Sequence, residues 1–317
     1  MSPGSRNKSF FAAGERLAAK KPGLRFRAEI LQAIRSFFIE TGYLEIETPL
    51  LIPAPAPELY IDAIHAGNSF LHTSPELCMK RLLASGYEKI FQICKCFRDG
   101  ERGAAHLPEF TILEWYRAMA DYQSLMNECE EMMFHLSQKL ALGHRISYGG
   151  REIDLLPPWS RLTVNDAFSR YADIPLDAAL AAGSFDEAMV TQIEPHLGAP
   201  KPAFLCDYPS SLASLARRKR NEPQSAERFE LYVGGLELAN GFSELIDVVE
   251  QKRRFEEERE KRDRLGKKNY PSPDRFLEAM PYMPESAGIA LGVDRLVMVL
   301  TDQGSIDSVV AFTPEEL

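Results

Sequence analysis

The first clear periodicity in the chain lies in residues 24–41, where apolar side chains recur at intervals of three and four. The apolar set is Leu24, Ile30, Leu31, Ile34, Phe37 and Phe38. This spacing places them near one face and predicts an amphipathic helix. We expect the helix to end at Thr41-Gly42, because glycine readily adopts the left-handed conformation that follows a helix.

Further along the chain, apolar runs and turn residues predict a series of strands and helices. Helices are expected over residues 77–84, with Pro75 in the first turn and Ser74 or Thr73 as cap, and over residues 121–142. Strands are expected at residues 43–48, 89–97, 110–116, 203–207, 229–233 and 237–245, and residues 288–293 lead into a final helix from Asp294. Three prolines make residues 51–57 an extended loop. Strands paired by hairpins, with helices before and after them, predict an α+β fold in which helices flank an antiparallel sheet.

The composition is that of a globular protein, with 45% hydrophobic and 26% charged residues among 317. No apolar run approaches the ~20 residues of a membrane span, so we expect a cytoplasmic protein. Residues 1–23 are polar and basic without an apolar core, which predicts a mobile leader rather than a secretory signal. We expect one catalytic domain over residues 24–317, in which residues 150–200 form a peripheral insertion of loops and helices.

The net charge of −9 gives the chain no overall attraction to nucleic acid. Two basic stretches stand out, at residues 217–220 and 251–268. In the second, acids and bases alternate at helical spacing, which is typical of a solvated helix face. The first is a candidate surface for an acidic partner.

Five scattered cysteines do not form an even, regularly spaced set, which argues against a disulfide framework. Cys94 and Cys96 lie two residues apart in a predicted strand, so both should point to one face. A zinc site would need two more thiols or imidazoles at suitable spacing, and the neighbouring sequence offers none. We therefore interpret the cysteines as buried, reduced thiols.

Three segments carry a family resemblance. Phe97-Arg98, a charged loop and then residues 106–110 (HLPEF) resemble motif 2 of the class II aminoacyl-tRNA synthetases, residues 288–295 (GIALGVDR) resemble motif 3, and residues 42–49 resemble motif 1. Residues 226–230, residues 237–245 (ELANGFSEL) and Ser74-Pro75-Glu76 before residues 80–82 resemble the lysyl-tRNA synthetase core. The likeness covers nearly the whole chain. It extends to the truncated paralogues of this family that attach (R)-β-lysine to elongation factor P.

The resemblance implies that the chain activates an amino acid with ATP. In this reaction a carboxylate attacks the α-phosphate and expels pyrophosphate, so catalysis depends on positioning and charge neutralisation. Guanidinium groups suit polyphosphate because they are permanently charged and bidentate. By resemblance, Arg98 holds the α-phosphate, Arg295 holds the γ-phosphate, and adenine lies between Phe110 and the Arg295 guanidinium. The ATP-binding set that the family implies is Arg98, Glu101, His106, Phe110, Glu237, Leu238, Gly292 and Arg295.

The resemblance also implies sites for Mg²⁺ and for a lysine-like substrate. The family uses Glu237 and Glu244 for magnesium, in keeping with the preference of this ion for oxygen ligands. The two are seven apart, so on a straight strand they would face opposite sides, and a bulge at Asn240-Gly241 could restore a common direction. A buried ammonium must be paired, and the family places acids there. The implied substrate-binding set is Ser74, Glu76, Tyr116, Asn240, Phe242, Glu244 and Ala290, with Glu114 either an orienting residue or a surface acid at a strand edge.

Three departures separate the sequence from full lysyl-tRNA synthetases. Only ~25 residues precede the first catalytic helix, too few for the five-stranded OB-fold that reads the anticodon. Ala290 replaces the middle glycine of motif 3, and its methyl should disfavour L-α-lysine. In motif 2, Arg98 is followed by Asp99, Gly100 and Glu101, so the acceptor for the adenine amino group is Glu101, Asp99 or backbone, and Leu107 replaces an asparagine.

These departures favour the truncated paralogues over full lysyl-tRNA synthetases. The resemblance alone then implies a protein-modifying ligase that transfers lysine or a lysine analogue, with (R)-β-lysine first among them, to a lysine of elongation factor P. One alternative is a minimal lysyl-tRNA synthetase that charges tRNA or another acceptor with L-lysine. Another is a non-catalytic amino-acid-binding module, although retention of Arg98, Glu237, Glu244 and Arg295 argues against it. Because motif 1 resembles a segment of the dimer interface in this class, we expect a homodimer, and tRNA is not expected as a partner.

Overall fold

The computed structural model describes the backbone of residues 3–317 and the side chains from residue 14 onward. Its centre is an eight-stranded sheet in the order β1-β5-β6-β13-β12-β11-β10-β9. The strands are β1 (Leu44–Glu45), β5 (Lys89–Phe97), β6 (Glu109–Ala118), β13 (Ser286–Gly292), β12 (Leu236–Ser243), β11 (Ser225–Val233), β10 (Ala203–Pro209) and β9 (Ser160–Thr163). Neighbours from β5 to β10 are antiparallel, as predicted, whereas β1 and β9 run parallel to β5 and β10. The sheet is therefore mixed at its two edges.

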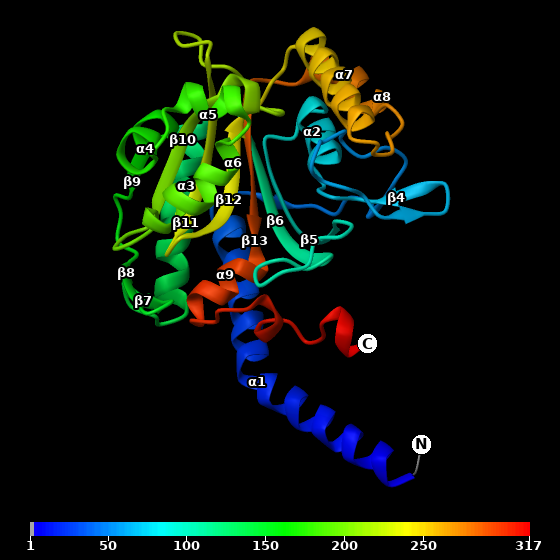
Figure 1. Cartoon of the computed structure of the whole chain (residues 1–317), viewed down its shortest axis with the longest axis vertical. Coiled ribbons are helices and arrows are strands. Elements are labelled where there is room, and N and C mark those ends of the chain that lie inside the picture. The colour runs from blue at the N-terminus through cyan, green and yellow to red at the C-terminus, as the bar shows by residue number, and fades with distance from the viewer. Residues whose placement is uncertain (1–2) are drawn as a thin grey trace.

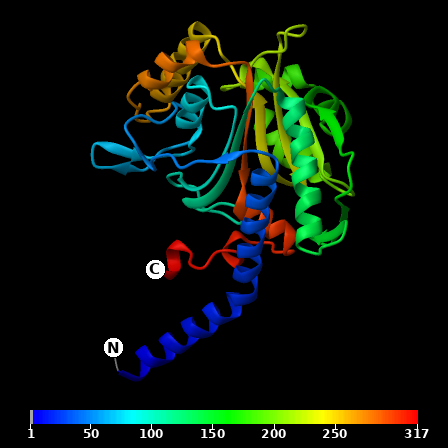
Figure 2. The same ribbon diagram turned by 180° about the vertical axis from the view of Figure 1, so that it is seen from behind.

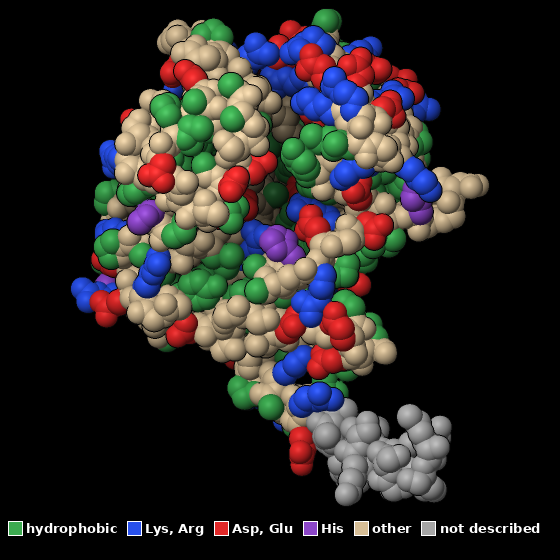
Figure 3. Space-filling view, viewed as in Figure 1, with side chains coloured by type: hydrophobic (Ala, Val, Ile, Leu, Met, Phe, Trp, Pro, Cys, Tyr) green, Lys and Arg blue, Asp and Glu red, His purple; other side chains and the backbone are tan. Residues whose placement is uncertain are grey.

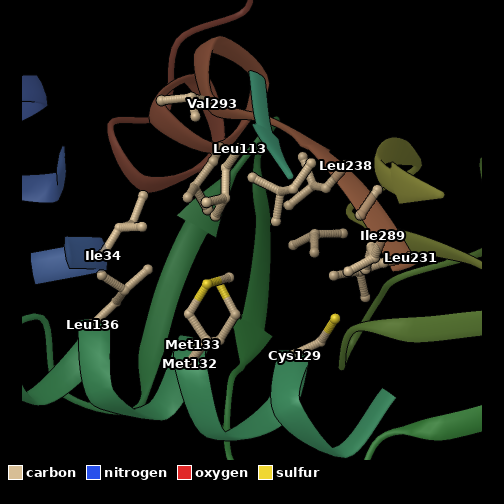
Figure 4. Close-up of a cluster of buried hydrophobic side chains, with 14 of the residues drawn as sticks. Ile34, Leu113, Cys129, Met132, Met133, Leu136, Leu231, Leu238, Ile289 and Val293 are labelled. Carbon is tan, nitrogen blue, oxygen red and sulfur yellow. The ribbon is translucent and has the colours of Figure 1, made fainter. Parts of the chain in front are cut away.

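One face of this sheet is covered by long helices. Helix α1 (Pro3–Glu40) packs beside α3 (Tyr122–Lys139), and α9 (Val293–Leu300) closes the end of β13. In Figure 4, side chains of α3 such as Met132, Met133 and Leu136 point toward Leu113 and Ile289 on the sheet. All five side chains are almost fully removed from solvent. Burial of this apolar face, at about 25 cal/mol for each Å² removed from water, is the main force that holds helices and sheet together.

The other face of the sheet is only partly covered, and two groups of elements stand on either side of it (Figure 1). One group contains α2 (Glu76–Ala84), α7 (Val248–Arg264), α8 (Asp274–Ala279) and the small sheet of β2 (Leu51–Ile52), β4 (Ser69–Leu71) and β3 (His65–Ala66). The other contains α4 (Val164–Tyr171), α5 (Leu176–Ala182) and α6 (Phe185–Ala188), and a hairpin of β7 (Arg145–Tyr148) and β8 (Arg151–Asp154) lies at the far end. The space-filling view shows a deep hollow between the two groups (Figure 3).

Two parts of the fold differ from the predictions. Helix α1 begins at Pro3 rather than at residue 24 and continues through Pro22, so residues 3–23 of the expected leader are helical, while residues 1–2 lie outside the described residues. The segment 150–200, expected as loops and helices, supplies β9 to the main sheet and packs its own apolar cluster around Phe168 against β10 and β11. The strand predicted at residues 43–48 shortens to β1. No helix in the described part of the chain is long and apolar enough to cross a membrane.

Candidate active site

The register of three central strands builds the floor of a cavity. Tyr116 of β6 lies opposite Gly288 of β13, which lies opposite Phe242 of β12. The next row on the same face is Glu114, Ala290 and Asn240. Alternate residues of a strand share a face, so both rows point into the hollow of Figure 3 and line a cavity of about 300 Å³. The family-derived substrate residues Ser74, Glu76, Tyr116, Asn240, Phe242 and Ala290 all line it.

Glu114 is part of the cavity wall rather than a surface acid. Its side chain is buried and accepts hydrogen bonds from Ser74 Oγ at 2.6 Å and Tyr116 Oη at 2.8 Å. Ser74 in turn accepts a hydrogen bond from the backbone N–H of Glu76 at 3.0 Å, at the start of α2. The alternative of a surface acid at a strand edge is therefore wrong, and the orienting role of Glu114 in the substrate site stays a prediction.

A buried lysine joins two of the expected substrate acids. Lys80 Nζ lies 2.5 Å from Glu76 Oε1 and 2.5 Å from Glu244 Oε2. The other oxygen of Glu244, Oε1, has no hydrogen-bond partner among the described residues and is fully buried. A Cβ at Gly288 would lie 2.6 Å from this oxygen and 2.2 Å from Tyr116 Cε1, so only glycine fits here. Sequence reasoning missed both Lys80 and this requirement at Gly288.

The acids at this end of the cavity destabilise one another's charge. Burial and the charge of Glu76 raise the pKa of Glu58 to about 7 and that of Glu114 to about 8. Burial also raises the pKa of Glu244 to about 8, with Glu76 adding to the effect and Lys80 opposing it. Desolvation is the largest cause at all three acids, because burial disfavours the charged form of a carboxylate. Glu58 was missed from the sequence, although an acid directly after a proline-rich loop is rigidly placed.

Arg98 and Phe110 come together elsewhere in the lining of the cavity. The Arg98 guanidinium lies 4.9 Å from the Phe110 ring centre, and Glu101 lies 3.8 Å from the same guanidinium. Glu101 lines the cavity, whereas Asp99 is exposed and is absent from the lining, so Glu101 is the better placed of the two candidate adenine acceptors. Arg98, and not Arg295, stacks on Phe110 here. The adenine sandwich with Arg295 stays a prediction.

Arg295 is held by a set of backbone and side-chain contacts. Its Nη1 donates to Glu237 O at 2.8 Å, and its Nη2 lies 2.6 Å from His106 Nε2. Burial and the positive charge of Arg295 lower the pKa of His106, so the imidazole stays neutral and can accept this hydrogen bond. The preceding residue, Asp294, is buried, accepts from Thr111 N at 2.6 Å and pairs with Arg27. Arg295 therefore lies on helix α9, which the contacts of Asp294 hold against β6 and α1.

The strand β12 contains the bulge that the sequence predicted, at a different position. Its register against β11 shifts between Ala239 and Glu237, and not at Asn240-Gly241. As a result both Glu237 and Leu238 line the cavity, and so does Gly292. Glu244 lies beyond the end of β12, does not line the cavity and is engaged by Lys80. The assignment of one metal ion to Glu237 and Glu244 together stays a prediction.

The basic run at residues 217–220 is not a free positive patch. Each of its four side chains is paired with an acid: Arg217 with Glu227, Arg218 with Glu250, Lys219 with Asp207 and Arg220 with Glu285. The expectation of a docking surface for an acidic partner at this run therefore loses its basis, because its charge is already neutralised within the chain.

Comparison with known proteins places this geometry in a family. Residues 11–316 match the model of the tRNA synthetases class II (D, K and N). The chain belongs to this family. It is 38% identical over 314 residues to a lysine–tRNA ligase of Moorella thermoacetica, covering 90% of this chain but 64% of that protein. It thus spans less than two thirds of the length of such ligases.

Two relatives of similar identity are matched over nearly their full length. The elongation factor P–(R)-β-lysine ligase of Salmonella gallinarum is 37% identical over 318 residues, with 93% of this chain and 96% of that protein covered. The corresponding ligase of Pectobacterium carotovorum is 38% identical over 319 residues, with 94% and 97% covered. In length as well as identity, the chain is similar to these truncated members of the family.

Proposed function

We propose that this chain is a cytoplasmic ligase that activates a lysine-type amino acid with ATP and transfers it to elongation factor P, with (R)-β-lysine as the preferred substrate. The relatives named elongation factor P–(R)-β-lysine ligase, matched over 96–97% of their length, support this assignment. The family membership supports an adenylate-forming reaction.

The observation that carries the proposal is the surplus of buried carboxylates at one end of the cavity. Glu58, Glu76 and Glu114 line the cavity, and Lys80 joins Glu76 to Glu244, which is buried beside it. Burial raises the pKa of Glu58, Glu114 and Glu244. Because unpaired buried charge is costly, the site gains most from a ligand that brings two ammonium groups. Lysine and β-lysine each carry two, whereas most amino acids carry one.

The reaction begins at the other end of the cavity. The substrate carboxylate attacks the α-phosphorus of ATP, the bond to the bridging oxygen of pyrophosphate breaks, and an aminoacyl-adenylate forms. Arg98 beside Phe110 and Arg295 beside His106 supply fixed positive charge for the phosphates, since neither arginine must reorient from solvent. The lysine amine of the acceptor protein then attacks the acyl carbon, AMP leaves, and an amide bond forms.

Glu237 is the carboxylate of this chain that best fits a magnesium ion. It lines the cavity 3.3 Å from the Arg295 guanidinium, and its carboxylate oxygens are ligands of the kind that a hard cation prefers. When bound, Mg²⁺ would neutralise phosphate oxygens there. Glu244 would contribute only after release from Lys80.

A homodimer is part of the proposal. Helix α1 and the strands after it expose Ile39, Leu44 and Leu51, each at least half accessible to solvent, and Leu44 lies in the segment that resembles motif 1. Exposed apolar side chains at and beside this segment favour association with a second copy. Light scattering coupled to size exclusion should give twice the chain mass, and a monomer at micromolar concentration would reject this part.

The direct test is transfer to protein. Purified chain, ATP and (R)-β-lysine are incubated with elongation factor P, and the acceptor is weighed by mass spectrometry, with an acceptor whose target lysine is replaced by arginine as control. One added aminoacyl group on the native acceptor alone supports the proposal. Charging of tRNA by the same preparation with L-lysine, without change in the acceptor protein, would overturn it.

A further inference from the structure

A cluster of soft metal ligands lies outside the active-site cavity. Cys94 and Cys96 point to one face of β5, as the sequence predicted. The sequence did not predict that His72, which follows β4, places its imidazole against them. We propose that His72, Cys94 and Cys96 bind a zinc ion or a cation of similar softness.

The donor geometry matches a tetrahedral zinc ion. His72 Nε2 lies 3.6 Å from Cys96 Sγ and 4.0 Å from Cys94 Sγ, and the three donor atoms all lie within 4.8 Å of one another. Zinc bonds of about 2.3 Å to sulfur and about 2.0 Å to nitrogen require donor separations of roughly 3.5–3.8 Å. Small side-chain shifts would therefore complete the site, and two thiolates with an imidazole are a ligand set that zinc favours.

The His72 nitrogen that faces the thiols is held there by the backbone of β5. His72 is fully buried, and its Nδ1 has no hydrogen-bond partner among the described residues. Its Nε2 lies 2.7 Å from Lys95 O, a contact that holds this nitrogen next to the thiols. A metal ion would replace the Nε2 proton and the thiol protons. The remaining coordination position is open to water or to the Lys95 carbonyl, since Cys94 is half-buried.

A disulfide between Cys94 and Cys96 fits the geometry of the strand less well than a metal ion does. Residues two apart in a strand have Cα atoms about 6.6–6.8 Å apart, at the upper limit of about 6.8 Å for a disulfide. The strand pairing also continues through both positions, with Cys94 opposite Ile112 and Cys96 opposite Phe110. Closing a bond between the sulfurs would distort this ladder, whereas a metal ion between them would not.

The location gives the ion a structural role beside the active site. The N–H of Phe97 donates to His72 O at 3.0 Å, so the segment that leads to Ser74 and Glu76 already lies along the end of β5. Arg98 follows Cys96 by two residues and stacks on Phe110. An ion held by His72 and the two cysteines would fasten the amino-acid side of the cavity to its phosphate side.

Zinc binding is measured on the 317-residue chain in its reduced form, after any bound metal has been removed with a chelator. Zn²⁺ is titrated against a chromogenic chelator, and the melting temperature is recorded with and without Zn²⁺. We expect one equivalent per chain and a higher melting temperature. The double variant C94S/C96S should lose more than the roughly 10–100-fold in affinity that loss of an outer-shell partner costs. The matched control is Cys78→Ser, a half-buried free cysteine on α2, which should bind zinc like the parent.

A second measurement needs no variant. Co²⁺ added to the parent chain should produce the near-ultraviolet absorption of cobalt bound to thiolate, and Zn²⁺ should remove it. The proposal is overturned if the parent chain binds no zinc, if C94S/C96S binds it equally well, or if cobalt shows no thiolate absorption. These readouts do not involve ATP or amino acid, so their failure would leave the proposed ligase function standing.

Discussion

Lys80 and Glu244 form an ion pair of 2.5 Å between Nζ and Oε2, and both side chains are almost completely buried. The same ammonium reaches Glu76. The chain therefore supplies a buried cation of its own beside the cavity, which pairs with Glu76 and Glu244 and leaves Glu244 Oε1 without a hydrogen-bond partner among the described residues. A lysine-type substrate enters a site whose charges are already organised around a fixed ammonium.

Replacing Lys80 by methionine should be strongly destabilising, because it leaves buried acids without their partner. Breaking a buried pair on one side costs about 3–5 kcal/mol, measured as the free energy of unfolding in urea. The matched control is Lys95→Met, which removes an exposed pair with Glu109 worth less than about 1 kcal/mol. Equal losses of unfolding free energy in the two variants would contradict the role of Lys80 as the buried partner of these acids.

The stability of the ligand-free protein should fall as pH rises through neutrality. The pKa of Glu114 is raised from 4.5 to about 8. A raised carboxylate pKa contributes stability below the unfolded value, and this contribution is lost as pH rises through the folded value. Between pH 4.5 and about 8 the Glu114→Gln variant should therefore show a flatter dependence of unfolding free energy on pH. Parallel curves would show that Glu114 is not the titrating group.

Gly288 and Gly292 should respond differently to alanine, although both belong to β13. At Gly288 the new Cβ would lie 2.2 Å from Tyr116 Cε1, and such overpacking costs typically about 1–3 kcal/mol. At Gly292 the nearest side-chain atom is 3.6 Å away, an ordinary contact. Thermal melting should show a loss for Gly288→Ala and little change for Gly292→Ala. A stable Gly288→Ala protein would mean that Tyr116 can move aside.

Ala290→Gly should shift substrate preference toward L-α-lysine. Ala290 lies between Glu114 and Asn240 on the cavity floor, so its methyl occupies space that a bound substrate could otherwise fill. The ratio of pyrophosphate exchange rates with L-α-lysine and (R)-β-lysine measures the shift. Ala287→Gly, on the opposite face of the same strand and fully buried, is the control. An unchanged ratio of exchange rates in Ala290→Gly would show that Ala290 does not determine the choice between the two lysines.

Local sequence patterns were sufficient for much of the central sheet. The apolar run at residues 89–97 coincides with β5, and the charged loop after it led correctly to the antiparallel partner β6. The strand β9 could not be predicted, because its four residues, Ser160–Thr163, are largely polar and gain their place only by pairing with β10. Parallel pairing at both edges likewise depends on contacts between distant segments.

Motifs predicted the residues that the fold brings together along the cavity, but they did not predict the partners of those residues. Arg98, Tyr116 and Arg295 lie on the cavity because strand alternation and a helix start place them there. The sequence shows Lys80 only as one basic residue of a predicted helix. No neighbouring residue indicates that its side chain is buried between Glu76 and Glu244. His72 was missed beside Cys94 and Cys96 for the same reason, since the loop that carries it approaches β5 only in the folded chain.

The central claim is that the cavity takes an amino acid with two ammonium groups and joins it to AMP. ATP–pyrophosphate exchange with the purified chain tests it most directly, comparing (R)-β-lysine, L-α-lysine and norleucine, which has the carbon chain of lysine without the terminal ammonium. We predict exchange that is fastest with (R)-β-lysine, slower with L-α-lysine and absent with norleucine. Exchange with norleucine as fast as with either lysine, or no exchange with any amino acid, would contradict the claim.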